Sequence, residues 1–202
     1  MRVLILSFDG LSGELARKFG CKHLLQVSQG RIDLTLYFLA GGGKKHNDGT
    51  IEPLTHEIYA TFLSGKLPNE HKIKGVFTCD NLHERNIKAI LHQPDSVGID
   101  VPTWSESVLQ HLHRKLIIDM LFKKNITLSQ VEKIVFDDIN RQLEVFKECL
   151  IPIWRKRLVF KYFSFIDLFS HVYTDFKRFK ERYRKIYLLA DKVAKEMLHA
   201  FT

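Results

Sequence analysis

The stretch that decides the fold is RVLILSFDG, residues 2–10. Residues 2–8 form a continuous, largely apolar run that ends abruptly at Asp9 and Gly10. A short apolar run with such sharp boundaries is typical of a strand that is buried on both faces, as in a parallel sheet. The run is too short, and too soon followed by an acidic residue, for a signal peptide. We therefore predict a buried strand with an aspartate at its carboxyl end.

Further elements are predicted along the chain, and strands and helices mostly alternate. The predicted helices cover residues 12–28 (interrupted at Gly20), 55–64, 102–113, 127–154 and 174–200, and the other predicted strands cover residues 31–39, 74–77 and 158–166. A loop-rich insertion is expected around residues 78–101, where apolar residues follow no clear period. This order predicts one α/β domain over residues 1–202, with a mostly parallel sheet flanked by helices.

Composition narrows the class of protein. The chain has 202 residues, of which 45% are hydrophobic and 27% charged, as expected for a globular domain. No apolar run approaches the ~20 residues of a membrane-spanning helix, so no membrane partner is expected. The cysteines, Cys21, Cys79 and Cys149, are widely spaced and include no CxxC pair. This pattern argues against a disulfide framework and predicts a reducing, cytoplasmic setting.

The formal charge of +8 is concentrated in two runs, residues 155–157 and 177–185. Aromatic residues recur through the second run at steps of three or four, as Phe176, Phe179, Tyr183 and Tyr187. This spacing places them on one face of a helix. Two interpretations follow: an aromatic stripe that packs on the core beneath a solvated basic face, or a surface that binds nucleic acid.

A glycine-rich loop at residues 41–49 reads GGGKKHNDG and invites comparison with phosphate-binding loops. The Walker pattern requires a serine or threonine directly after its lysine, because that hydroxyl binds the magnesium ion. Here Lys44 is followed by Lys45. The sequence therefore predicts a flexible polar loop rather than a nucleotide-binding loop.

Two predicted strands lead into aspartates, Asp9 and Asp167. The carboxyl ends of parallel strands face the ligand crevice of an open sheet, so both carboxylates are expected there. Two carboxylates repel each other unless a cation lies between them. His171 follows Asp167 by four residues, which brings both side chains to one side of a helical turn. Carboxylate and imidazole ligands suit a divalent ion such as zinc or manganese.

Thr55 stands at the start of the predicted helix over residues 55–64. One interpretation is an N-cap, whose hydroxyl would accept a hydrogen bond from the first turn. The other is a nucleophile, since metal coordination and a helix N-terminus both favour an alkoxide beside an anionic phosphate. The two roles are compatible.

At this point the sequence resembles the type I phosphodiesterase/nucleotide pyrophosphatase family of the alkaline phosphatase superfamily. VLILSFDGL is similar to the family's first strand, with Asp9 at the metal-binding position. PLTHEIYATFLSGKLPNEHKIKG is similar to its nucleophile helix, with Thr55 as the nucleophile. FKYFSFIDLFSHVYTD is similar to the strand that carries an Asp-x3-His metal pair, here Asp167 and His171. The three stretches occur in the family's order.

The resemblance implies a shortened alkaline phosphatase-like fold and a metal-dependent phosphoesterase. In the family, two zinc-type ions bridge a phosphate ester, a threonine attacks in line, and water hydrolyses the phospho-threonine. Asp9 and Thr55 would then belong to one metal, and Asp167 and His171 to the other. The expected ligand is a small phosphate ester of the nucleotide type.

The sequence departs from the family at several positions. The family completes its metal sites with an Asp-His-Gly segment, and no Asp-His pair occurs in this chain. Ile58 replaces an asparagine of the nucleotide pyrophosphatases, and Lys72 replaces a common glycine. Three explanations follow: a second polypeptide or a homodimer that supplies ligands, other ligands such as His46, His56 or Glu57, or a non-catalytic phosphate-ester binder.

Overall fold

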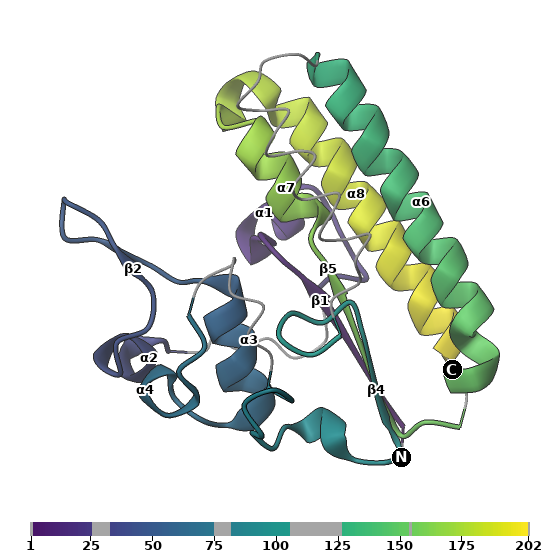
Figure 1. The fold of residues 1–202 in the computed structure, drawn as a ribbon. Helices are drawn as coiled ribbons and strands as arrows, with labels where there is room; N and C mark the ends of the chain where they lie inside the picture. Colours follow the sequence, from purple (N-terminus) through teal and green to yellow (C-terminus); the bar gives the residue numbers. More distant parts are fainter. Residues whose placement is uncertain (1, 26–32, 75–81, 106–126, 154, 202) are drawn as a thin grey trace.

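A three-stranded parallel sheet forms the centre of the molecule (Figure 1). The computed structural model describes residues 2–25, 33–74, 82–105, 127–153 and 155–201. The strands are β1 (Val3–Phe8), β4 (Ser96–Ile99) and β5 (Leu158–Phe163), in the order β1–β5–β4. The predicted parallel α/β sheet flanked by helices is confirmed, and β1 begins and ends within one residue of its predicted bounds.

Helices cover both faces of this sheet. The helices are α1 (Gly13–Lys18), α2 (Thr35–Leu39), α3 (Thr55–Ser64), α4 (Pro68–His71), the 3-10 turn η1 (Ile90–His92), α6 (Leu128–Ile153), α7 (Phe165–Val172) and α8 (Phe176–Phe201). In Figure 1, α6, α7 and α8 lie on one side of the sheet and α3 and α4 on the other. None of the described helices is long and apolar enough to cross a membrane.

The central strand β5 separates two apolar clusters because its side chains alternate between the faces. Val159 and Phe163 pack into the cluster formed with α1, α6, α7 and α8. Phe160 and Tyr162 pack into the cluster on the α3 side. A strand buried on both faces explains the aromatic and β-branched run in its sequence.

The long helices α6 and α8 run parallel to each other. Arg182 pairs with Glu132 near the start of both helices, and Lys147 donates to Glu196 at 2.7 Å near their ends. Thr127 and Gln130 form a capping box at the start of α6, since each accepts a backbone N–H of the other. Each helix begins and ends within two residues of its predicted bounds.

Four predicted elements are wrong in part. The helix predicted over residues 12–28 ends at Lys18, and residues 21–25 are not helical. Residues 35–39 form helix α2 rather than the second half of the strand predicted over residues 31–39, because they pack Tyr37 against Glu57 instead of pairing with a strand. The expected insertion over residues 78–101 contains β4, which pairs with β5 in the sheet. The last predicted strand ends at Phe163, not at Asp167, so Asp167 lies in the first turn of α7.

Two further predictions fall mostly outside the described residues. Of the strand predicted over residues 74–77, only Lys74 is described, and it is not in a strand. Of the helix predicted over residues 102–113, residues 102–104 form a turn and those after Ser105 lie outside the described part. Residues 41–49, which are predicted as a flexible polar loop, contain the short strand β2 (Lys44–Lys45), and this strand pairs with β3 (Ile51–Glu52) in a hairpin.

Candidate functional site

Asp9 lies at the carboxyl end of β1, where the parallel pairing with β5 continues for one more residue. Its N–H donates to the carbonyl of Phe163 at 2.9 Å. Gly10 then turns the chain with a φ of 72°, a conformation that glycine adopts without steric cost. The Gly10 N–H also donates to the Asp9 carboxylate at 3.2 Å. The strand thus ends with a half-buried carboxylate held at the edge of the sheet.

Thr55 reaches this carboxylate from the other side. It is the first residue of α3, and its Oγ1 donates to Asp9 Oδ2 at 3.1 Å. Tyr162 of β5 donates to the same oxygen from its hydroxyl at 2.7 Å. Ser7 and Tyr59 form a further hydrogen bond that ties β1 to α3. A nucleophile candidate and a carboxylate that can accept its proton are therefore in direct contact.

Asp167 and His171 form a pair on the exposed side of α7. Their Oδ2 and Nε2 atoms are 3.5 Å apart, and the His171 side chain is 63% exposed. The backbones of Gly10 and Asp167 lie close together: a Cβ added at Gly10 would be only 2.8 Å from the Asp167 Cα. This close approach places the pair next to Asp9. The first turn of α7 therefore packs directly on the residue after Asp9. We call Asp9, Thr55, Tyr162, Asp167 and His171 the strand-end site.

The N-terminus of α3 adds backbone donors to this site. The N-cap residue is Leu54, which provides no side-chain cap, and Thr55 follows it as the first helical residue. The interpretation of Thr55 as the N-cap is therefore wrong, because its hydroxyl bonds to Asp9 instead. A helix start without a side-chain cap leaves backbone N–H groups that can bind an anion.

A pocket of about 340 Å³ opens beside Asp9 and Thr55. It runs along the outer edge of β1, since five consecutive residues from Ile5 to Asp9 line it. Ile58, Tyr59 and Phe62 of α3 form most of the opposite wall. The pocket thus offers an apolar, partly aromatic wall next to a polar end.

Within the described residues, no group of three or more histidine, cysteine or acidic side chains is arranged to hold a metal ion. The strand-end site offers a carboxylate and a hydroxyl at Asp9 and Thr55, and a carboxylate and an imidazole at Asp167 and His171. These are ligand types that suit zinc or manganese, whereas a catalytic zinc site usually has three protein ligands.

Two of the alternative ligands have structural partners instead. Glu57 is buried and accepts hydrogen bonds from the Tyr37 hydroxyl at 2.9 Å and the Gly43 N–H at 2.8 Å. It thereby fastens α2 and the following loop to α3, and burial raises the pKa of the Tyr37 phenol beside it. His46 pairs with Glu52 at 3.0 Å in the exposed β2–β3 hairpin.

The other histidines near α3 are buried. His56 is 4% exposed and His71 is 1% exposed. His71 Nδ1 accepts the Ile73 N–H at 3.0 Å, so its Nε2 carries the proton of the neutral ring and donates to Thr61 Oγ1 at 3.0 Å. Burial lowers the pKa of His71. His71 is thus a neutral structural residue that fixes α4 to α3.

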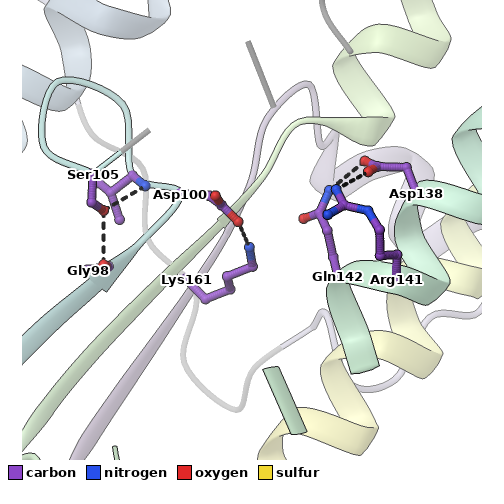
Figure 2. Close-up of polar contacts among 8 residues, drawn as sticks. Gly98, Asp100, Ser105, Asp138, Arg141, Gln142 and Lys161 are labelled. Atoms are coloured by element: carbon purple, nitrogen blue, oxygen red, sulfur yellow. Dashed lines mark hydrogen bonds and ion pairs between the residues drawn. The ribbon is translucent and has the colours of Figure 1, made fainter. Parts of the chain in front are cut away.

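A second polar centre lies at the same carboxyl end of the sheet, but on the opposite face (Figure 2). Lys161 of β5 is 1% exposed and forms an ion pair with Asp100, which follows β4. Burial lowers the pKa of Lys161, and the Asp100 carboxylate opposes that effect. Across from them on α6, Asp138 accepts from Arg141 at 2.8 Å and from Gln142 at 2.6 Å.

The sequence predicts Asp9, Thr55 and the Asp167–His171 pair as site residues, and it does not single out Tyr162 or Asp100, which the structure places at the same end of the sheet. Tyr162 was predicted only as part of a strand, although alternation along β5 puts it on the α3 face. Asp100 was assigned to an insertion, although the stretch VGID ends in an acid as the first strand does. That shared ending was the available signal for a third strand and its polar end.

Comparison with known proteins gives no family for this chain. A scan against protein-family models finds no match, and searches of curated proteins and of solved structures find none either. The resemblance to the phosphodiesterase family therefore stays a prediction that depends on the sequence motifs.

Proposed function

We propose that this protein is a metal-dependent phosphoester hydrolase with Thr55 as its nucleophile. The observation that supports this most directly is the hydrogen bond from Thr55 Oγ1 to Asp9 Oδ2 at the carboxyl end of a parallel sheet. A carboxylate at that distance orients the hydroxyl and favours loss of its proton. The proposal includes an alkaline phosphatase-like arrangement of the fold, in a shortened form.

The reaction follows from the chemistry of a hydroxyl nucleophile. Thr55 Oγ1 would form a bond to phosphorus as the ester P–O bond opposite it breaks, and the departing alkoxide would take up a proton. Water would then attack the phospho-threonine and release phosphate or a phosphate monoester. The backbone N–H groups at the start of α3 would bind the phosphoryl oxygens, because they lie at the positive end of a helix of ten residues.

We assign the ligands of two divalent ions, zinc or manganese, to residues of the strand-end site. Asp9 and Thr55 would hold one ion, and Asp167 and His171 would hold the other. Such an ion would lower the pKa of a bound hydroxyl and neutralise the phosphate. Because this set gives each ion only two protein ligands, substrate oxygens, water or a second polypeptide would complete the coordination.

The test is hydrolysis of bis(4-nitrophenyl) phosphate with added Zn²⁺ or Mn²⁺. Thr55→Ala should abolish metal-stimulated release of nitrophenol, and Thr55→Ser should retain part of it because a hydroxyl remains. Thr50→Ala is a matched control, since Thr50 lies in the exposed hairpin and its hydroxyl donates to Asp48 at 2.6 Å. Undiminished hydrolysis by Thr55→Ala would overturn the assignment.

A second candidate is a half domain that a partner chain completes. The outer edge of β1 pairs with no other described strand, and the apolar pocket runs along this edge. An unpaired edge beside an apolar groove is where a further strand would add. If this candidate holds, the purified monomer should lack turnover, and activity should appear only in a homodimer or with a second polypeptide. Light scattering and activity of the same chromatographic fractions separate the two candidates.

A further inference from the structure

The outer face of α8 is strongly basic. Its aromatic residues point inward: Tyr183 and Tyr187 are buried in the core, and Phe176 and Phe179 are half-buried. This confirms the aromatic stripe that packs on the core, and it leaves the basic residues in solvent. We call the exposed cations of this helix the α8 basic face: Lys177, Arg178, Lys180, Arg184, Lys185, Lys192 and Lys195.

The charge of α8 is unbalanced. The helix contains eight lysines and arginines but three acidic residues, which makes a formal +5 out of the chain's +8. Two of the acids also have partners outside the helix: Asp191 accepts the N–H groups of His23 and Leu24, and Glu196 accepts from Lys147 at 2.7 Å. Glu196 also lies 3.9 Å from Lys192 of the face. Only Glu181, 3.7 Å from Arg184, lies within the first half of the face. Lys177 and Lys185 each lie four residues from Glu181, Lys195 lies four from Asp191, and Lys192 four from Glu196. Arg178, Lys180 and Arg184 have no acid four residues away, so the face keeps an excess of positive charge.

The geometry of the face suits a linear polyanion. The helix kinks at Phe179, and from Lys180 to Lys195 it continues for about 23 Å at 1.5 Å per residue. Lys18 of α1 adds a further cation at the start of α8, with its ammonium 5.8 Å from the centre of the Phe176 ring. Residues 155–157 are held against the segment that precedes β4 instead: Lys156 donates to the Pro94 carbonyl at 2.6 Å, and the Arg157 N–H donates to the Asp95 carbonyl at 2.7 Å.

We propose that the α8 basic face binds the phosphate backbone of a double-stranded nucleic acid without sequence preference. A single strand fits less well, since the aromatic rings that would stack on unpaired bases are at least half-buried beneath the helix. A membrane surface also fits less well, because α8 exposes one large apolar side chain, Leu188, and interfacial helices insert several. Contacts between lysine or arginine side chains and phosphates, without contacts to bases, are typical of sequence-independent binding to the nucleic-acid backbone.

This inference does not depend on the proposed hydrolase, and its test needs no turnover. Binding of a fluorescent 24-base-pair DNA duplex is measured by anisotropy with the full chain, without metal, between 50 and 300 mM salt. If five cations of the face contact phosphates, log K should fall with log[salt] with a slope of about −4.5. The triple variant Lys180→Gln/Arg184→Gln/Lys185→Gln should reduce the slope by about 2.7 and weaken binding at least about ten-fold at 0.1 M salt.

The control variant is Lys44→Gln/Lys45→Gln/Lys66→Gln, which removes the same charge from exposed positions outside α8. It should keep the wild-type slope, and Thr55→Ala should bind as the wild type does. Glutamine is a good helix former, so circular dichroism should show unchanged helix content in the α8 variant. Equal losses in both triple variants, no binding at 50 mM salt, or tighter binding to phosphatidylserine vesicles or single strands than to the duplex would each overturn the proposal.

Discussion

Removal of the Asp100 carboxylate tests the second polar centre most sharply. Lys161 is 2% exposed at its side chain and Asp100 is 16% exposed, so Asp100→Asn leaves a buried ammonium without its counter-charge. Breaking a buried ion pair from one side costs about 3–5 kcal/mol. We expect the lower end, about 3 kcal/mol, because Asp100 is partly solvated. Against a typical domain stability of roughly 5–15 kcal/mol, the variant should still fold.

The pH dependence of this variant has a defined sign. Burial lowers the pKa of Lys161, and Asp100 is the main group that opposes this, so Asp100→Asn lowers the pKa further. Between the folded pKa and the unfolded value near 10.4, the unfolded chain binds more protons than the folded chain. Stability of the variant should therefore rise with pH in that window, by up to about 1.4 kcal/mol per pH unit, and be lost as pH falls through the folded pKa.

The assay is urea denaturation of wild type and variants at several pH values between 7 and 10. Lys161→Met combined with Asp100→Asn removes both charges and should recover stability to within about 1 kcal/mol of wild type. Glu196→Gln is the control at a partly solvated ion pair, and loss of its bond to Lys147 should cost less than about 1 kcal/mol at every pH. A cost below 1 kcal/mol for Asp100→Asn, with no recovery at alkaline pH, would refute the reasoning.

Two further predictions concern the contact of Gly10 with α7 and the buried His71 of α4. Gly10 has a left-handed backbone conformation, and Gly10→Ala would place a Cβ 2.8 Å from the Asp167 Cα. The variant should therefore be destabilised by more than about 1 kcal/mol, measured by urea denaturation. It should also hydrolyse any substrate more slowly, because the new Cβ pushes Asp167 away from Asp9. Burial lowers the pKa of His71, so its contribution to stability is present above pH ~6.5 and lost as pH falls through the folded pKa. The stability difference between wild type and His71→Asn should therefore shrink between pH 7 and 5, and a constant difference would contradict a buried neutral ring.

Residues with strong local signals were predictable from the sequence. The apolar run that ends at Asp9 has the length and boundaries of a buried strand, and α3 has the predicted bounds of residues 55–64 because Gly65 ends it in the left-handed conformation. The periodic stripe in α8 identified its buried face. In each case the local pattern and the tertiary contacts favour the same structure.

The rest of the fold depended on contacts that a local pattern does not contain. β4 has only four residues and includes Gly98, so its pairing with Phe160 of β5, not its propensity, makes it a strand. Residues 31–39 alternate only in part, through Ile32, Leu34, Leu36 and Phe38, yet the Tyr37 hydroxyl bonds to buried Glu57 and α2 packs as a helix. The contact of Tyr162 with Asp9 spans 153 positions, which no motif could have indicated.

The two polar centres share one structural support. Lys161 and Tyr162 are consecutive residues of β5 and point to opposite faces, so any shift of this strand moves both. The Lys161–Asp100 pair fixes β5 against the end of β4, and the Tyr162 hydroxyl holds the Asp9 carboxylate that contacts Thr55. A buried ion pair adds little net stability compared with apolar packing, so its value here is position rather than energy.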